Sequence, residues 1–313
     1  MLPYVLKRVL SAVPVMIVVA VVIFAILRLT PGDPAAILAG NDATEEQMAQ
    51  IRESLGLDEP ILVQLVTWCR NILAGDLGVS LLSGVPVLKM IGDRVGPTLA
   101  LAVGTMTVTI LVAIPMGIVA ARKPGGHLDR LVMALSVMGF SVPIFVTGYV
   151  LIYLFALKLG WLPVQGYRPP GDGLLPFLQR LVLPVLALSG VYIALVARMT
   201  RSSIIEVLGE DYIRTARAKG ATGTRILLRH ALRNAAVPIV TIIGIGVASL
   251  ITGVVVTESV FNLPGLGRLV VEAVLARDYP VIQGLILLFS FTYILINLVV
   301  DILYTVFDPR IRY

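Results

Sequence analysis

Long apolar runs alternate with shorter polar segments along the whole chain. A helix of about 20 apolar residues can cross the hydrocarbon core of a bilayer, and six of the runs are about that long or longer. They cover residues 9–29, 98–121, 131–159, 181–199, 237–256 and 281–307. The pattern therefore predicts an all-α integral membrane protein with six transmembrane helices.

Two of these runs have unusual features. The third, residues 131–159, is longer than one perpendicular crossing requires and contains Pro143, so we expect a tilt or a kink to absorb the excess. The first follows Lys7 and Arg8, as the apolar part of a signal peptide would, but it is longer than such a part usually is. We therefore expect it to be a retained first span.

The stretch between the first two spans has the composition of a small extramembrane domain. Thr44 and Gln47 have the spacing of a capping box at the start of one helix, and Pro60 suits the first turn of a second. These signals predict a small helical insertion. The predicted domains are residues 1–30, with a cytoplasmic N-terminus and the first span; 31–96, the periplasmic insertion; and 97–313, a core with five spans.

Two further segments are expected on the outer side. A stretch rich in Pro and Gly, residues 161–177, carries three candidate anchors at the membrane interface: Trp161, Tyr167 and Phe177. Residues 257–284 have the pattern of a surface helix bracketed by turns.

A long polar and basic segment, residues 206–234, separates the fourth span from the fifth. Its first half has apolar residues at four-residue spacing, namely Leu208, Tyr212 and Ala216, which predicts a short amphipathic helix. Gly220 is the permissive residue expected just past its end, and Thr222 is a candidate N-cap for a second helix from about Arg225 toward Pro238. The alternative is an ordinary basic loop. The apolar stripe of the segment argues against it, because apolar side chains of this kind must be covered by neighbouring helices or by a partner protein.

Composition supports a membrane protein and narrows its chemistry. The 313 residues are 58% hydrophobic and 14% charged, with a mean hydropathy of +0.94. Cys69 is the only cysteine, which excludes an intrachain disulfide, and the only histidines are His127 and His230, so no metal site is expected.

The basic residues predict the orientation. If six spans alternate, 15 of the 25 Lys and Arg residues fall on the side of the termini. Because cytoplasmic loops carry the excess of Lys and Arg, both termini and residues 206–234 are expected in the cytoplasm. This accounts for the net charge of +6 without a nucleic-acid partner.

No catalytic motif is present in the sequence. GxxxxGK[ST], HExxH and GxSxG are all absent, and so is a pair of carboxylates at mid-membrane depth, so we expect neither catalysis nor a bound cofactor. Asp301 is expected to pair with Arg198 or Arg201, with a role in a substrate or ion path as the alternative.

Other polar residues are weaker candidates for the pathway. Glu258, at the outer end of the fifth span, is expected to be a hydrated carboxylate, with a gate or docking contact as the alternative. Six hydroxyl residues in the second and third spans are expected to bond to their own helices rather than to line a path: Thr105, Thr107, Thr109, Ser136, Ser141 and Thr147. Among all these residues, Ser141, Thr147 and Glu258 are the candidates we retain for the translocation path.

Several short motifs carry a family resemblance over nearly the whole chain. They are RLTPGDPA, GDLGVS, PTLALA, DYIRTARAKGA with LLRHALRNA, FNLPGLGRL, RDYPVIQ and DPRIR. Together they resemble the permease subunits of bacterial ATP-binding-cassette (ABC) importers for dipeptides and oligopeptides. The similarity is closest to the first, B-type permease and to the glutathione and dipeptide branch.

The resemblance implies a fold and a set of partners. The fold is that of a type I importer permease in the bacterial inner membrane, with cytoplasmic coupling helices between the fourth and fifth spans. The chain would form half of the pathway as a heterodimer with a second permease. Two ATPase subunits would bind ATP and Mg²⁺, and a periplasmic binding protein would deliver the substrate.

The resemblance also implies a docking site for the ATPases. The cytoplasmic signature of the family is an EAA sequence followed by Gly, and here Gly220 takes the glycine position with Arg214, Thr215 and Ala216 at the EAA places. The Glu is absent, and Arg233 stands where some relatives have Pro. The implied coupling residues are Glu210, Asp211, Tyr212, Arg214, Thr215, Ala216, Arg217, Lys219, Gly220 and Arg225.

Other functions are open at this point. Relatives also carry nickel chelates or opines. A secondary transporter would need inverted repeats or a buried ionisable relay, and neither is apparent. A membrane enzyme would need a set of a nucleophile, a base and a metal site, and no such set is apparent in the sequence.

Overall fold

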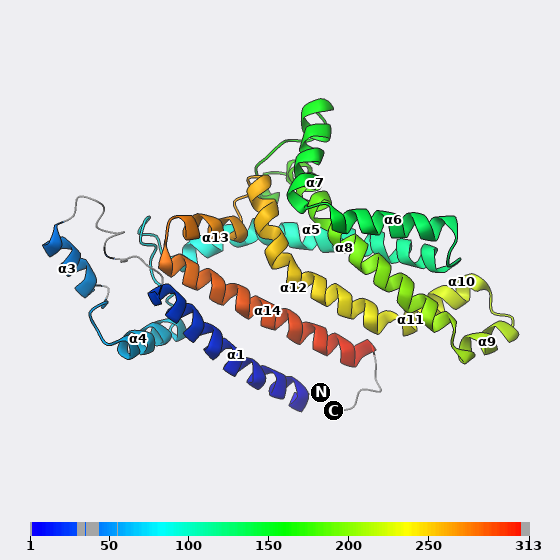
Figure 1. Cartoon of the computed structure of the whole chain (residues 1–313), viewed down its shortest axis with the longest axis horizontal. Helices are drawn as coiled ribbons and strands as arrows, with labels where there is room; N and C mark the ends of the chain where they lie inside the picture. The colour runs from blue at the N-terminus through cyan, green and yellow to red at the C-terminus, as the bar shows by residue number, and fades with distance from the viewer. Residues whose placement is uncertain (1, 30–34, 36–43, 55, 308–313) are drawn as a thin grey trace. The chain divides into compact units, whose positions relative to one another are not determined.

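The computed structural model describes residues 2–29, 35, 44–54 and 56–307. Within these residues the regular elements are helices, apart from one isolated antiparallel bridge between Val79 and Pro86 (Figure 1). The chain divides into two compact units. The first contains Met1–Gly96 and Gly265–Leu295, and the second contains Pro97–Pro264 and Ile296–Tyr313. The motifs RLTPGDPA and DPRIR lie largely or wholly outside the described residues.

Among the described residues, five helices are long and apolar enough to cross a membrane, and a bent pair of helices makes a sixth span if it counts as one crossing. The five are α1 (Leu2–Leu29), α5 (Val87–Ala121), α8 (Leu174–Leu208), α12 (Ala236–Val260) and α14 (Tyr279–Phe307). Each contains a predicted run, and α5 and α8 extend well beyond theirs. Five of the six predicted runs are thus confirmed as helices that can span a membrane, and the bent pair covers the third run.

The third span is broken rather than tilted. It consists of α6 (His127–Ser141), α7 (Ile144–Leu151) and the π-helix η1 (Ile152–Lys158), with a bend of 102° between α6 and the following pair. Val142 is extended, with φ −93° and ψ 121°, because a residue before proline is pushed out of the helical region. Pro143 thus ends one helix and precedes the next.

The first unit holds the helical insertion, α3 (Glu45–Ser54) and α4 (Ile61–Leu73). The predicted capping box is confirmed: the Thr44 amide donates to Gln47 Oε1 at 3.0 Å, and the Gln47 amide donates to Thr44 Oγ1 at 3.3 Å. Helix α4 packs on α1, where the rings of Trp68 and Phe24 lie 5.7 Å apart.

Two of the sequence motifs meet within this unit. Asp278 of RDYPVIQ is buried and accepts a hydrogen bond from the Ser80 hydroxyl of GDLGVS at 2.5 Å and another from the Leu81 amide at 3.1 Å. Close by in sequence is the predicted surface helix, α13 (Leu266–Leu275), whose Glu272 pairs with Arg94 and Arg268 at 2.7 Å each. These polar contacts hold the short connection between α13 and α14, residues 276–278, in place.

Helix α8 is the centre of the second unit and packs against α6, α7 and α12 (Figure 1). The contact with α6 is close, because a Cβ at Gly139 would lie 2.9 Å from the carbonyl oxygen of Gly190. The largest cluster of buried side chains lies along α8 and α12 and includes Leu188, Tyr192 and Leu250.

The loop after η1 differs from its prediction. Trp161 is 66% exposed, as an interfacial anchor requires, but the rings of Tyr167 and Phe177 pack edge to face at 6.1 Å against the buried cluster. The Gly166 amide donates to the Phe261 carbonyl at 3.1 Å, which ties the loop to the end of α12. Burial raises the pKa of the Tyr167 phenol above its ordinary value.

Candidate coupling site and pathway residues

After α8 ends at Leu208, the rest of residues 206–234 forms a helix, a glycine turn and a second helical stretch, as the sequence predicts. The first helix is α9 (Asp211–Ala218). The second stretch consists of α10 (Gly223–Arg225), the π-helix η3 (Ile226–Ala231) and α11 (Leu232–Asn234), and it leads into α12. It begins two residues earlier than predicted and does not end at Pro238, which lies in the first turn of α12, where a helix tolerates proline.

The glycine turn has the geometry of a Schellman motif. Gly220 has φ +80°, its amide donates to the Arg217 carbonyl at 2.9 Å, and the Ala221 amide donates to the Ala216 carbonyl at 3.1 Å. Gly220 therefore lies just past the end of α9, as expected, and has the positive φ that a glycine accommodates without strain. Thr222 lies at the N-cap position of α10, but its side chain makes no capping hydrogen bond.

The buried face of α9 differs from the predicted stripe. Ile213 is fully buried, whereas Tyr212 is 42% exposed. The prediction is wrong because Leu208 belongs to α8, so the four-residue spacing to Tyr212 crosses the turn at Gly209 and Glu210. Once α9 begins at Asp211, its register places Ile213 inward.

The two helical stretches are held to each other and to the spans. Asn234 Nδ2 donates to the Tyr212 hydroxyl at 2.8 Å, which links α9 to α11. Helix η3 contributes Leu227 and Ala231 to a buried cluster with Ala121 of α5 and Ile204 of α8. Packed side chains therefore join this segment to the ends of α5 and α8.

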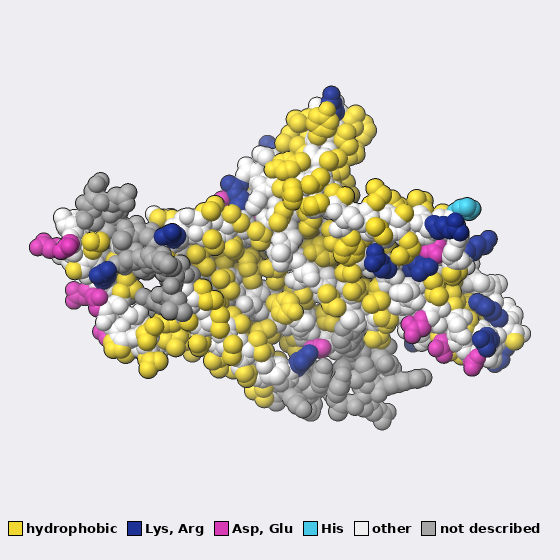
Figure 2. Space-filling model, viewed as in Figure 1, with side chains coloured by type: hydrophobic (Ala, Val, Ile, Leu, Met, Phe, Trp, Pro, Cys, Tyr) yellow, Lys and Arg dark blue, Asp and Glu magenta, His cyan; other side chains and the backbone are white. Residues whose placement is uncertain are grey.

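The outer face of the segment is polar and charged. Among the candidate coupling residues, Ala216 is half-buried and the rest are exposed: Glu210, Asp211, Tyr212, Arg214, Thr215, Arg217, Lys219, Gly220 and Arg225. Arg214 and Asp211 form an exposed ion pair at 3.1 Å. Figure 2 shows Lys and Arg side chains gathered over α9, α10 and the connection between α5 and α6.

The predicted pairing of Asp301 with an arginine of α8 is wrong. Both carboxylate oxygens of Asp129, on α6, accept hydrogen bonds from Arg201, from Nη2 at 2.7 Å and also from Nε. The Gly125 amide donates to Asp129 as well, at 2.8 Å. Arg198 lies 5.6 Å from the ring centre of Phe140. Asp301 and Asn297 have contacts of their own.

The expectation of a hydrated Glu258 is also wrong. Its side chain is fully buried, and Oε1 accepts a hydrogen bond from the Thr98 hydroxyl of α5 at 2.6 Å. Within the second unit this contact joins the outer end of α12 to α5. A single sequence cannot reveal this contact, because Thr98 lies 160 residues away from Glu258 in the chain.

The hydroxyl residues behave in two ways. Ser136, Ser141 and Thr147 return their hydroxyls to carbonyls of their own helices or caps at 2.8, 2.9 and 3.5 Å, as expected. The hydroxyls of Thr105 and Thr109 are buried and have no hydrogen-bond partner among the described residues, so the expectation fails for them. Thr107 is exposed.

Sequence reasoning missed Asp129 and the pocket next to it. Asp129 is the acidic residue in the first turn of α6, a position that favours carboxylates, and that signal was available in the connector ARKPGGHLDR. The pocket, described below, depends on how the ends of α5, α6 and α8 meet α9 and η3, which a single sequence does not give.

Comparisons with known proteins agree with this architecture. Residues 113–313 match the family of binding-protein-dependent transport system inner membrane components, and residues 1–102 match its N-terminal part. The chain belongs to this family, and it is a multi-pass inner membrane protein of the predicted all-α class.

Individual relatives match over their full length. The chain is 53% identical over 99% of both chains to y4tP of Sinorhizobium fredii, which carries the name of a peptide ABC transporter permease protein. It is 46% identical over 100% of both chains to the glutathione transport system permease protein GsiC of Salmonella typhimurium.

A solved structure shares the fold. The MetNI methionine ABC transporter in an inward-facing conformation matches with a TM-score of 0.59 and 19% identity, covering 71% of this chain and 97% of the other. This likeness concerns the fold alone.

Proposed function

We propose that the chain is one of two permease subunits in an ATP-driven importer of peptides, meaning dipeptides, oligopeptides or glutathione. The names of the relatives supply the substrate class, and family membership supplies the dependence on a binding protein. In this proposal the chain lines half of the pathway and carries no catalytic residue. Two partner ATPases bind ATP and Mg²⁺, and a periplasmic protein presents the peptide.

One observation carries the mechanical part of the proposal. Helix α9 is short, is anchored by the buried Ile213, ends in a Schellman turn at Gly220 and presents an exposed charged face. A short rigid element with a free polar surface suits docking in a groove of another protein. The coupling residues of this face are those that the family resemblance implies.

The transmission step follows from the packing of the segment. When the ATPases close on ATP, they would move α9, and the Tyr212 to Asn234 hydrogen bond would carry that motion into α11. From there, α12 continues the chain, and the cluster around Leu227 reaches the ends of α5 and α8. Such a displacement of helical ends is the rigid-body type of switching that alternating access requires.

The orientation belongs to the same proposal. With both termini and α9 in the cytoplasm, the segment faces the ATPases, and the insertion with α3 and α4 faces the binding protein. The count of basic residues supports this orientation.

Association with ATPase chains tests the proposal directly. The tagged chain, expressed with the second permease and the ATPase genes of the same operon, is expected to retain the ATPases on purification and to hydrolyse ATP in proteoliposomes when binding protein and peptide are added. The chain purified alone is expected to hydrolyse none. ATP hydrolysis by the single chain, or transport driven by an ion gradient without ATPases, would contradict the proposal.

The substrate class is tested separately on the binding protein. Calorimetric titration with dipeptides, oligopeptides and glutathione, against a nickel chelate and an opine as competing classes, is expected to give binding only with peptides. Tight binding of a nickel chelate or an opine would mean that the substrate class is not peptides, although the assignment as an importer permease would stand.

A further inference from the structure

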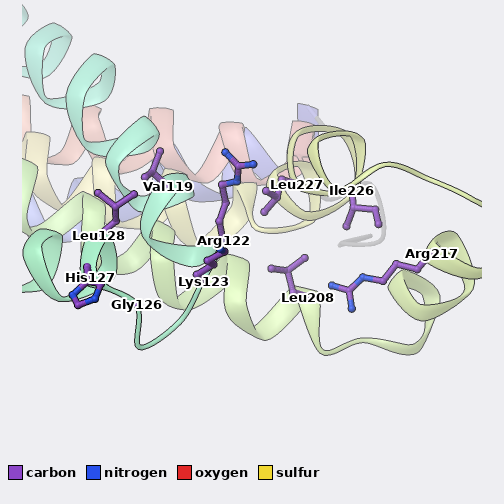
Figure 3. Close-up of a pocket in the computed structure, with 11 residues that line it drawn as sticks. Val119, Arg122, Lys123, Gly126, His127, Leu128, Leu208, Arg217, Ile226 and Leu227 are labelled. Carbon is purple, nitrogen blue, oxygen red and sulfur yellow. The ribbon is translucent and has the colours of Figure 1, made fainter.

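A pocket of about 660 Å³ lies where the ends of α5, α6 and α8 meet α9 and η3 (Figure 3). Its apolar lining comes from five side chains: Val119, Leu128, Leu208, Ile226 and Leu227. Its polar lining is cationic, from Arg122, Lys123 and Arg217, with His127 beside them. None of the residues that line it is acidic.

The three cations have no counter-ion within the described part of the chain. Arg122, Lys123 and Arg217 make no side-chain hydrogen bond or ion pair there, unlike Arg201 and Arg214. Figure 3 shows Arg217 reaching from α9 toward Leu208, across the pocket from the α5–α6 connection. Like charges gathered around an apolar surface repel one another, and an anion bound between them relieves that repulsion.

The nearest carboxylate does not provide that anion. Asp129 lies on α6 only two residues beyond His127, but both of its oxygens are already held by Arg201, and the Gly125 amide also donates to it. Its side chain is buried and directed to α8. The cationic rim is therefore left for a ligand from outside the chain.

We propose that this pocket binds an anionic phospholipid, with the phosphate at Arg122, Lys123 and Arg217 and the upper acyl chains on the apolar lining. The pocket is lined by residues at the ends of α5, α6 and α8, which belong to candidate membrane spans. The ends of membrane spans reach the region of the lipid headgroups. Basic pockets at the cytoplasmic ends of transmembrane helices favour anionic headgroups. Placing this lipid in the cytoplasmic leaflet rests on the orientation given in the proposed function. The existence of the pocket and its lining do not depend on that orientation.

The ligand chemistry follows from the two kinds of lining. A free phosphate ion would satisfy the cations but leave the apolar side chains in water. A carboxylate on a partner protein would meet the cations without filling the apolar part. An anionic lipid does both, and it would bridge the α5–α6 connection to α9, stabilising the coupling segment in its docked position.

Lipid binding to the purified full-length chain tests the proposal. The chain is delipidated in a neutral detergent and titrated with dioleoylphosphatidylglycerol or dioleoylphosphatidylethanolamine, and bound lipid is counted by native mass spectrometry. The test variant is Arg122→Gln with Lys123→Gln, two exposed positions outside the candidate coupling residues. The matched control is Arg229→Gln with Arg233→Gln, which removes the same charge from two exposed positions of η3 and α11 that do not line the pocket.

We expect one phosphatidylglycerol to bind in preference to phosphatidylethanolamine, the test variant to weaken this binding by roughly tenfold, and the control to stay within about twofold of the wild type. Equal losses in both variants, no loss in either, or equal binding of the two lipids would overturn the proposal. Displacement of the lipid by millimolar inorganic phosphate would show a simple anion site instead.

A second measurement separates this proposal from ATPase docking. If the test variant binds lipid like the wild type but loses the ATPase chains on purification, the cations contact a protein partner and the lipid proposal is wrong, although the importer assignment stands. Loss of lipid with the ATPases retained supports the lipid proposal alone.

Discussion

Gly220 is the residue on which the shape of the coupling segment depends most. Its φ of +80° lies in the left-handed region, where a residue with a Cβ is strained, yet a Cβ there would meet no atom within 4 Å. A substitution at Gly220 therefore tests backbone conformation without steric interference.

The first prediction compares two substitutions at this position. Gly220→Val should cost about 1–2 kcal/mol locally, because a β-branched residue accommodates the left-handed region poorly, whereas Gly220→Asn should cost less. Both variants should reach the membrane, but Gly220→Val should lose most of its substrate-stimulated ATP hydrolysis in the reconstituted complex, and Gly220→Asn should keep most. Normal activity of Gly220→Val would show that the turn is only a flexible linker.

Asp129 illustrates a second effect at the scale of one residue. Its charge is buried and compensated by Arg201, so Asp129→Asn leaves a partly buried guanidinium without its counter-ion. We expect a loss of about 3 kcal/mol in the free energy of unfolding, measured as denaturation of the detergent-purified chain. Asp211→Asn, in the exposed pair with Arg214, should cost less than about 1 kcal/mol. Equal effects of the two variants would contradict this account of the Asp129 pair.

At the scale of the element, α9 is held by very few contacts. Ile213 is its only buried residue, and an eight-residue helix is not stable alone in water. Packing of one side chain and the link from Tyr212 to Asn234 therefore decide whether α9 stays in place.

Ile213→Ala should release α9 from η3, the element that it packs against. Removing a fully buried isoleucine side chain beyond Cβ costs about 2–5 kcal/mol, more than a single exposed hydrogen bond contributes, so Tyr212→Phe should have a smaller effect. Amide hydrogen exchange of residues 211–218 should accelerate strongly in Ile213→Ala and only slightly in Tyr212→Phe, with the spans unchanged in both. Unchanged exchange in Ile213→Ala would mean that α9 is held by other contacts.

The sequence predicts elements better than it predicts contacts between them. The spans were predictable because apolar length is a strong signal in one dimension, and the capping box at Thr44 and the turn at Gly220 are local motifs. The register of α9 was missed because it depends on where α8 ends. The partners of Glu258 and Arg201 could not be predicted, since Thr98 and Asp129 approach them from distant parts of the chain.

At the scale of the whole molecule, the number of spans determines which segments share a side of the membrane. The bent third span matters here, because α6 and the α7–η1 pair must together count as one crossing for the termini to lie on the same side as α9. The family assignment does not give the orientation, so the basic residues remain its only support.

Cysteine labelling tests that orientation. In a Cys69→Ser background, a cysteine replacing Gln50 on α3 should react with a membrane-impermeant maleimide in intact cells, and one replacing Pro124 in the α5–α6 connection should react only after the membrane is opened. Both positions are exposed, and Pro124 is preferable to Gly125, whose φ of +77° would strain a cysteine.

Tags at the two termini test the number of crossings in the same cells. If the chain made five crossings, with α6 and α7 as a re-entrant pair, the two termini would lie on opposite sides of the membrane. Labelling of Pro124→Cys in intact cells, or opposite accessibility of the two tags, would reject the six-span orientation and with it the position of α9 beside the ATPases.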